Sequence, residues 1–303
     1  MEFDLLSSLF VRLRLQASVQ NVFEAGGRWA IEVPPHRGLK VHTILKGRYW
    51  VSLAGDPVPR ELVAGDSYLL PRGDPFTMAS HRDFSDQGLV QRTSVHRSEG
   101  LTRLNTGGEV LGSGLFFDFD SPFADLLFQS LPSLVVVPAD ASRAPDLQTN
   151  LRRFATEFEN SRVGRTLILH QLAPVILVDF LRACFTEAGA QVSWFGALAE
   201  DDLSGVLHLM HTDYGHRWTL GELASAVGVS RSKLAGRFQK AVGVSPMEYL
   251  CRWRMEVARD LLVHDGKNIA EVSQAVGYES ESAFSAAFVR VFQIRPGRMA
   301  GRR

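Results

Sequence analysis

The sequence predicts a two-domain α+β protein, with a β-rich N-terminal domain and flanking helices ahead of an all-helical C-terminal domain. Three observations predict it. Up to about Val137 the chain reads as short β-rich segments between clusters of Gly, Pro and Asp. From Ala144 onward the apolar residues recur at helical intervals instead. The last hundred or so residues contain an internal repeat, which indicates two copies of one supersecondary unit.

Five segments of the N-terminal part have the composition of strands, because they are short, rich in β-branched and aromatic residues, and bounded by turn-forming residues. They cover residues 29–33, 41–45, 49–53, 67–70 and 114–119. Many short strands at close spacing predict a barrel or a sandwich. Helices are expected at 147–158, at 166–188 with a bend or break near Pro174, and at 201–211.

The net charge of zero conceals an asymmetry between the two parts of the chain. From Arg217 onward there are 14 Lys and Arg against 8 Asp and Glu, and before it 19 against 25. A basic C-terminal part is typical of a domain that binds nucleic acid, although a surplus of this size also occurs in domains that do not.

Cysteine usage and hydropathy favour a soluble, cytoplasmic protein. Cys184 and Cys251 are far apart and form neither a disulfide framework nor a zinc site, which fits a reducing compartment. The most apolar stretch, 167–181, is interrupted by polar residues and is shorter than the ~20 residues of a membrane span. We therefore expect no membrane partner.

The C-terminal repeat has an offset of 49 or 50 residues. Its matching positions are Ala226, Val227 and Gly228 with Ala275, Val276 and Gly277, Phe238 with Phe288, and Pro246 with Pro296. In the first copy, Thr219 and Glu222 have the spacing of a capping box, Gly228 allows a turn through positive φ, and Ser230 caps a second helix. The second copy repeats this plan with Asn268, Glu271, Gly277 and Ser280.

One such turn alone is more often an ordinary helical hairpin, but two copies at one offset favour two helix-turn-helix units. Between them, Ser245, Pro246 and Glu248 predict the start of a long helix that runs to about His264. The second helix of the first unit has an outward face of cationic and small residues, which suits close approach to DNA, and the outward face of the second unit is far less cationic. The predicted DNA contacts are Ser230, Arg231, Ser232, Lys233, Ala235, Gly236, Arg237 and Lys240 in the first unit, and Ser280, Glu281, Ser282, Ser285, Ala286 and Arg290 in the second.

From Trp218 to Pro296 the chain closely resembles the DNA-binding domain of AraC/XylS-type transcription regulators. The resemblance is carried by residues 218–224, 228–234, Phe238, 243–246, Tyr249, Leu250, Arg254, Met255, Ala258, 277–280, Phe284, Phe288 and Pro296. It implies that both recognition helices enter successive major grooves on one face of the DNA, about one turn apart. Met299 stands where the family usually has Tyr, which affects only the terminal cap.

The resemblance also implies which residues read bases. These are Ser232, Ala235, Gly236 and Arg237 in the first unit, and Glu281, Ser282, Ser285 and Ala286 in the second. Because Ala and Gly offer no side-chain hydrogen bonds, specificity in the first unit depends on Arg237, which could bind guanine with two hydrogen bonds, and on contacts with thymine methyl groups. Lys233 and Lys240 are expected to contact phosphates.

In the N-terminal part, Gly65-Asp66, Pro71-Arg72-Gly73 and residues 41–47 resemble the two motifs of cupin barrels. His42 occupies one metal-ligand position, but Ile44 and Phe76 stand where two further histidines would be needed. Across residues 3–190 the resemblance is to the cupin-type sensor domain that is fused to AraC-type readers. It implies an effector pocket that includes His42 and Phe76, without a metal.

The leading hypothesis is a sensor and dimerisation domain at 1–195 with a cupin-like β-barrel, followed by a double helix-turn-helix DNA-binding domain at 201–303. Its expected partners are double-stranded DNA, a small-molecule effector, a second copy that binds through helices near 167–185, and RNA polymerase if the protein is an activator. We expect no catalytic residues and no cofactor. Two alternatives stay open: a cupin enzyme with a DNA-binding appendage, and a helical interaction module that never contacts DNA.

Overall fold

The computed structural model describes residues 4–56, 58–83, 90, 93–98, 101–119, 121–139, 144–160, 162–185 and 194–301. The chain divides into two compact units. One consists of Gln16–Asp118 and Leu131–Ala188, and the other of Met1–Leu15, Phe119–Ser130 and Gly189–Arg303. This division does not follow the expected boundary near residue 195, because two segments of the N-terminal half fold with the C-terminal helices.

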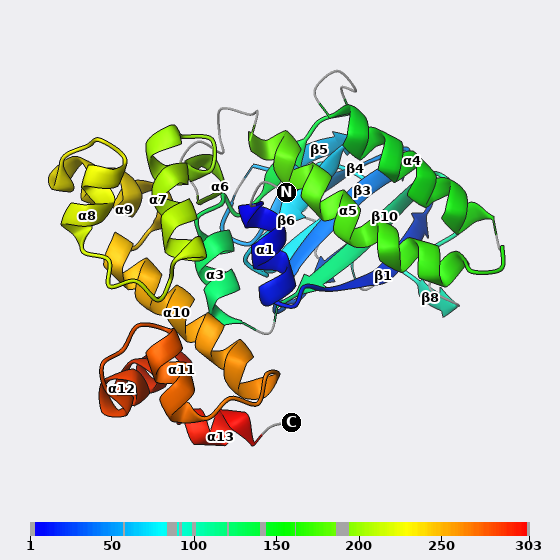
Figure 1. The fold of residues 1–303 in the computed structure, drawn as a ribbon. Coiled ribbons are helices and arrows are strands. Elements are labelled where there is room, and N and C mark those ends of the chain that lie inside the picture. Colours follow the sequence, from blue (N-terminus) through cyan, green and yellow to red (C-terminus); the bar gives the residue numbers. More distant parts are fainter. Residues whose placement is uncertain are drawn as a thin grey trace. The chain divides into compact units, whose positions relative to one another are not determined.

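The first unit contains two β-sheets (Figure 1). Its strands are β1 (Gln16–Ala25), β2 (Ala30–Val33), β3 (Leu39–Lys46), β4 (Arg48–Leu53), β5 (Arg60–Val63), β6 (Ser67–Leu70), β7 (Phe76–Ala79), β8 (Val95–Ser98), β9 (Leu101–Leu104), β10 (Val110–Asp118) and β11 (Val135–Val137). The seven-stranded sheet has the order β11-β6-β3-β10-β1-β9-β8, and the four-stranded sheet the order β2-β7-β4-β5. All five predicted strands are present with small shifts of their ends.

Aromatic side chains from both sheets fill the space between them. Phe23 of β1 lies 5.7 Å from Tyr49 of β4, measured between ring centroids, and 6.1 Å from Trp29. Tyr49 also donates a hydrogen bond to the hydroxyl of Tyr68 on β6 at 3.3 Å. Because these rings are buried and belong to one apolar cluster, the two sheets close around a packed interior.

Two helices cover the seven-stranded sheet, as Figure 1 shows for α4 (Pro145–Glu159) and α5 (Arg165–Phe185). Of the expected bend or break near Pro174, a break is absent, because α5 continues through this residue. The stretch Arg165–Cys184 is long and apolar enough to cross a bilayer, but 56% of its apolar window is buried inside the protein. Its apolar residues are therefore explained by packing on α4, β1 and β11.

The second unit is helical. Its helices are α1 (Leu5–Arg12), α3 (Pro122–Gln129), α6 (Trp194–Ala197), α7 (Asp201–Thr212), α8 (Leu220–Ala226), α9 (Arg231–Val242), α10 (Pro246–Val263), α11 (Ile269–Ala275), α12 (Glu281–Phe292) and α13 (Pro296–Ala300). The helix-turn-helix units are α8–α9 and α11–α12, and α10 is the spacer between them.

The local signals predicted for both units are present. Thr219 with Glu222, and Asn268 with Glu271, form complete capping boxes. The turn glycines have φ of 71° at Gly228 and 79° at Gly277. At Gly277 a Cβ atom would lie 2.4 Å from the carbonyl oxygen of Gly215, so only glycine fits there.

The ends of the two recognition helices differ in one respect. Gly243 ends α9 in the left-handed conformation with φ of 85°, whereas Gln293, at the equivalent position of the repeat, ends α12 with φ of 59°. A side chain with a Cβ atom is strained in this conformation by ~1–2 kcal/mol.

We therefore expect Gln293→Gly to stabilise the protein by ~0.5–1 kcal/mol, because it relieves this strain while losing only a local hydrogen bond to the carbonyl oxygen of Arg290. Urea unfolding followed by circular dichroism measures the change. A destabilisation comparable with that of Gly243→Gln would show that the Gln293 side chain is required at this helix end.

Candidate DNA interface and effector site

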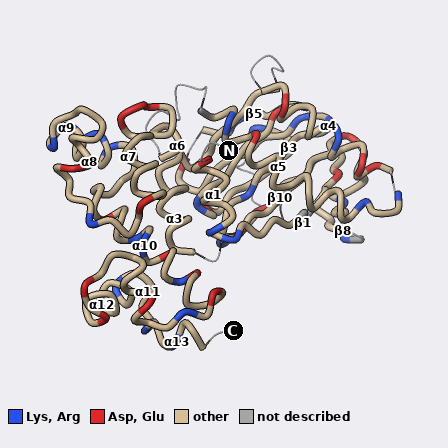
Figure 2. Tube along the Cα trace, in the orientation of Figure 1, with Lys and Arg blue, Asp and Glu red and all other residues tan. Residues whose placement is uncertain are grey.

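The first recognition helix, α9, presents a polar and partly cationic face. Ser230 caps the helix by accepting a hydrogen bond from the backbone N–H of Lys233 at 3.3 Å, and Leu234 and Phe238 fix its buried side. The exposed residues are Arg231, Ser232, Lys233, Gly236, Gln239 and Lys240. Among the residues that the structure describes, none pairs its carboxylate with the cationic side chains of this face, so these charges are available to phosphates. Figure 2 marks the Lys and Arg positions of α9 in blue.

The second recognition helix, α12, repeats the exposure of α9 position by position. Over residues 281–290 the order of buried, half-buried and exposed side chains is the same as over 231–240. Ser280 caps the helix through the backbone N–H of Ala283 at 3.2 Å. Of the predicted readers, Glu281, Ser282 and Ala286 are exposed and Ser285 is half-buried. Glu281 adds negative charge at the start of this helix, in contrast to Arg231 in the first unit.

Arg237 lies at the side of α9 rather than on its exposed face. It is half-buried, as is Ala287 at the equivalent position of the repeat. Its guanidinium forms ion pairs with Glu200 and Asp202 at the start of α7, and the hydrogen bonds to these two carboxylates raise the pKa of Arg237. The expectation of an Arg237 side chain free to reach a guanine therefore differs from the structure, in which the side chain joins α9 to α7.

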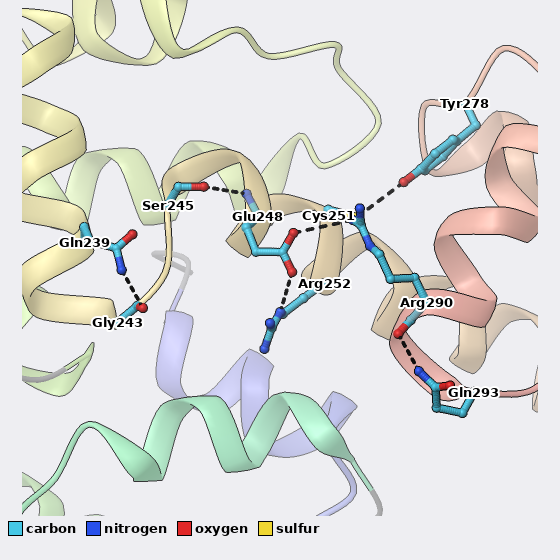
Figure 3. A network of polar contacts seen from close by, with 9 residues as sticks. All are labelled: Gln239, Gly243, Ser245, Glu248, Cys251, Arg252, Tyr278, Arg290 and Gln293. Carbon is cyan, nitrogen blue, oxygen red and sulfur yellow. Dashed lines mark hydrogen bonds and ion pairs between the residues drawn. The ribbon is translucent and has the colours of Figure 1, made fainter.

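Arg290, the repeat equivalent of Lys240, is held against the spacer helix (Figure 3). Its Nη2 atom donates to Sγ of Cys251 at 3.0 Å and lies 3.4 Å from Oε2 of Glu248. The hydroxyl of Tyr278 lies 3.6 Å from the same sulfur atom. The predicted DNA contact Arg290 is thus held by groups within the protein, and α12 offers less free positive charge than α9.

Tyr249 is the buried polar centre of the spacer helix. Its hydroxyl accepts a hydrogen bond from Nε1 of Trp194 at 2.8 Å and lies 2.8 Å from Nε2 of His211. Burial lowers the pKa of His211 well below its usual range and raises that of Tyr249, so both groups are neutral and the contact is a hydrogen bond between neutral partners. Phe238 of α9 packs on the Tyr249 ring at 5.5 Å, which connects the first recognition helix to this centre.

Two segments from the N-terminal half lie against the spacer helix within the same compact unit. Oγ of Ser121 donates a hydrogen bond to buried Glu256 at 2.5 Å. Arg12 and Arg14 form ion pairs with Asp260 at 3.4 and 3.2 Å. These contacts place α1 and the start of α3 on α10.

Both of these segments are continuous with one pair of neighbouring strands. Gln16 begins β1 and Asp118 ends β10, and the two residues are directly paired in the sheet. The chain that precedes Gln16 forms α1, and the chain that follows Asp118 leads to α3. The spacer helix is therefore bound by the two segments that extend from one end of this strand pair.

The predicted effector residues His42 and Phe76 lie together inside the β-rich unit. Their ring centroids are 5.7 Å apart and nearly perpendicular, and the imidazole stacks on Tyr68 at 5.0 Å. Burial, with smaller contributions from Lys40 and His36, lowers the pKa of His42 to about 3. The ring is therefore neutral near pH 7. Within the described residues, no group of three or more His, Cys, Asp and Glu side chains could hold a metal.

Sequence reasoning missed several residues of these sites. Gln239 is exposed on α9, and its place next to the predicted contact Lys240 could have indicated it. The cap signal of Ser121 followed by Pro122 could have indicated α3. Nothing in the local sequence indicated that Glu200 pairs with Arg237, because this contact joins different helices.

Comparisons with known proteins agree with a cupin-like N-terminal part and a helix-turn-helix C-terminal part. Residues 4–186 match the family model described as Cupin, and residues 223–302 match the model described as Helix-turn-helix domain. A putative AraC-like transcription regulator of Streptomyces antibioticus is 37% identical over 97% of this chain and 96% of its own length. The HTH-type transcriptional regulator AlkR of Acinetobacter baylyi is 29% identical, over 97% of each chain. The RCS-specific HTH-type transcriptional activator RclR of Escherichia coli is 27% identical over 97% of this chain and 96% of its own.

The Tyr249 hydroxyl gives a direct test of the spacer helix. We expect Tyr249→Phe to lower the free energy of unfolding by ~1–3 kcal/mol, because the buried indole N–H of Trp194 and the ring of His211 lose their partner. Tyr214→Phe, at a half-buried tyrosine, is the matched control and should change it by less than ~0.5 kcal/mol. Equal effects of the two changes in urea unfolding would contradict this account.

His42 predicts a dependence of stability on pH. The pKa of His42 is about 3 in the folded protein and 6.5 in the unfolded chain. Its contribution to the free energy of unfolding is therefore complete above pH 6.5 and is lost as the pH falls toward 3. The loss is at most ~1.4 kcal/mol per pH unit. In unfolding measured between pH 7 and 4.5, His42→Gln should therefore show a shallower decline than the unchanged protein. Parallel curves would mean that His42 is protonated equally in both states.

Proposed function

Because the chain belongs to the AraC family of transcription regulators and has an N-terminal cupin domain, we propose that it is a sequence-specific activator controlled by a small-molecule or chemical signal. The observation that carries this proposal is the repeated exposure pattern of α9 and α12, two recognition helices joined by one buried spacer. A helix that only packs inside a protein would not keep the same open face in both copies.

The DNA-binding function is assigned to residues 201–303, with the reading residues on the exposed faces of α9 and α12. Lys233 and Lys240 are proposed to bind phosphates, and their lack of carboxylate partners among the described residues supports this role. Arg237 reads a base only if DNA displaces Glu200 and Asp202 from its guanidinium. The other contact residues are those named from the sequence, with Gln239 added.

The sensor function is assigned to residues 1–195, with the effector near His42 and Phe76. We place the dimer contact on α5, where the large apolar side chains of Leu167 and Val175 are 66% and 43% exposed. An activator must also contact RNA polymerase, and the relative that is a transcriptional activator supports this direction of regulation. The proposed location is the cytoplasm, where the chromosome and the polymerase are accessible.

The test uses the full-length protein and a duplex selected by it from a random-sequence pool. We expect Lys240→Ala to weaken binding equally on all selected sequences and to reduce the slope of log affinity against log salt by ~1. Arg237→Ala should cost ~1–3 kcal/mol at one base-pair position. Arg97→Ala, an exposed cation on β8, is the control and should leave binding unchanged.

Two results would count against these roles. If no duplex is enriched by the protein, the reading of α9 and α12 as recognition helices fails. If Arg237→Ala weakens every sequence alike, Arg237 acts by holding α9 on α7 rather than by reading a base. The combined change Glu200→Gln and Asp202→Asn, made in the protein that keeps Arg237, separates the two roles. If Arg237 reads a base, its release strengthens DNA binding; if it holds α9 on α7, its release weakens DNA binding.

A further inference from the structure

The side chains of Lys40, His42 and His36, which all carry nitrogen atoms, lie at one end of the interior between the sheets. Lys40, His42 and Ile44 alternate along β3 and therefore point to the same side of the sheet. Ile44 belongs to the apolar cluster between the sheets, so Lys40 and His42 face that interior too. Lys40 and His36 are close enough to His42 to lower its pKa.

His42 is held by its rings and not by its nitrogen atoms. The residue is 8% exposed, Tyr68 stacks on the imidazole, and the ring of Phe76 lies nearly perpendicular to it. Neither ring nitrogen has a hydrogen-bond partner among the described protein groups. A buried polar group without a partner destabilises a fold by ~1–3 kcal/mol, so this position favours a molecule that supplies one.

His36 has a second unmet hydrogen bond. Its Nδ1 atom lies 3.2 Å from the carbonyl oxygen of Arg37, to which it donates, and this leaves Nε2 as an acceptor. Nε2 is buried and has no partner among the described groups. The residue is fixed in place by a backbone hydrogen bond to Gly73 at 3.0 Å, where a Cβ atom would lie 1.8 Å from the carbonyl oxygen of His36.

Lys40 supplies the positive charge. Its ammonium lies 5.9 Å from the centre of the Phe76 ring, it is half-buried, and burial lowers its pKa. No carboxylate among the described residues pairs with it, although partly buried charges in proteins are normally paired. Asp74 is near enough to raise the pKa of His36 but is not among the groups that act on Lys40 or His42.

We propose that Lys40, His42 and His36 bind the carboxylate and a hydroxyl group of a small hydroxy acid, whose carbon skeleton lies against Phe76. The inference deepens the proposed function and rests on it, because it names the class of effector. The carboxylate accepts hydrogen bonds from the ammonium of Lys40 and from the single N–H of neutral His42. The hydroxyl of the ligand donates to Nε2 of His36.

The charge available at this site selects a carboxylate over other anions and over a metal. One ammonium and one neutral N–H balance a single negative charge, whereas a phosphate monoester carries nearly two at pH 7. A transition metal would be held by two imidazoles beside a cation, and the described His, Cys, Asp and Glu side chains form no group of three that could hold one. The aromatic ring of Phe76 suits a compact apolar skeleton.

The test measures binding to the full-length protein by calorimetry, with two acids and their uncharged amides: lactate with lactamide, and 3-hydroxybenzoate with 3-hydroxybenzamide. We expect at least one acid to bind and its amide to bind at least ~tenfold more weakly, as for the loss of a charge-assisted hydrogen bond. Lys40→Met should weaken binding of the acid by a similar factor. Lys46→Met is the matched control, because Lys46 lies at the other end of the same strand and donates to the carbonyl oxygen of Gly108.

Binding of neither acid, equal binding of acid and amide, or equal effects of Lys40→Met and Lys46→Met would overturn the inference, as would binding of Zn²⁺ that is lost in His42→Gln. A parallel DNA-binding assay separates this inference from the proposed function. If the acid binds at Lys40 and DNA binding does not respond, the site stands and regulation by this ligand fails. If DNA binding responds to an acid equally in Lys40→Met, regulation stands and this site fails.

Discussion

The buried spacer helix α10 is the element on which both recognition units depend. A surface linker of this length would leave α9 and α12 free to move separately, but most of α10 is buried. Tyr249 fixes the start of the helix, because its hydroxyl lies within hydrogen-bonding distance of Trp194 and His211. Its second half is held by Ser121, the N-cap of α3, which donates to Glu256, and by Arg12 of α1, which pairs with Asp260. The contacts of Tyr249 are neutral and buried, and those of Glu256 and Asp260 involve charged side chains. The helix therefore cannot slide without breaking several polar contacts at once.

The two recognition helices share a shape but differ in charge. α9 carries cations without carboxylate partners among the described residues, whereas Arg290 of α12 is bound by Cys251 and Glu248, and Glu281 adds an acid (Figures 2 and 3). Attraction to the phosphate backbone therefore acts more strongly on the first unit. We propose that the second unit contributes mainly through short polar side chains such as Ser282 at base edges, for which correct placement by α10 matters more than charge.

Much of this could be predicted from the sequence, because caps, turn glycines and a fixed repeat offset are local signals. They located both helix-turn-helix units and the spacer, and short β-rich segments between clusters of Gly, Pro and Asp located five strands. The helix α1, the strand β1 and the ion pairs of Arg237 were not predicted, since they depend on contacts between distant segments. The pairing of His42 with Phe76 in one site came from motif resemblance, whereas the unmet hydrogen bonds of His42 became apparent only with the geometry of its neighbours.

The rigid placement of two reading helices on one face of DNA is tested most directly by changing the spacing of their half-sites. The measurement is the affinity of the full-length protein for its selected duplex after five or ten base pairs are inserted between the two contacted segments. With α10 fixed as described, both insertions should reduce affinity to that of a single half-site, because neither restores a one-turn separation of ~10 base pairs. Undiminished affinity for either duplex would contradict a stiff spacer.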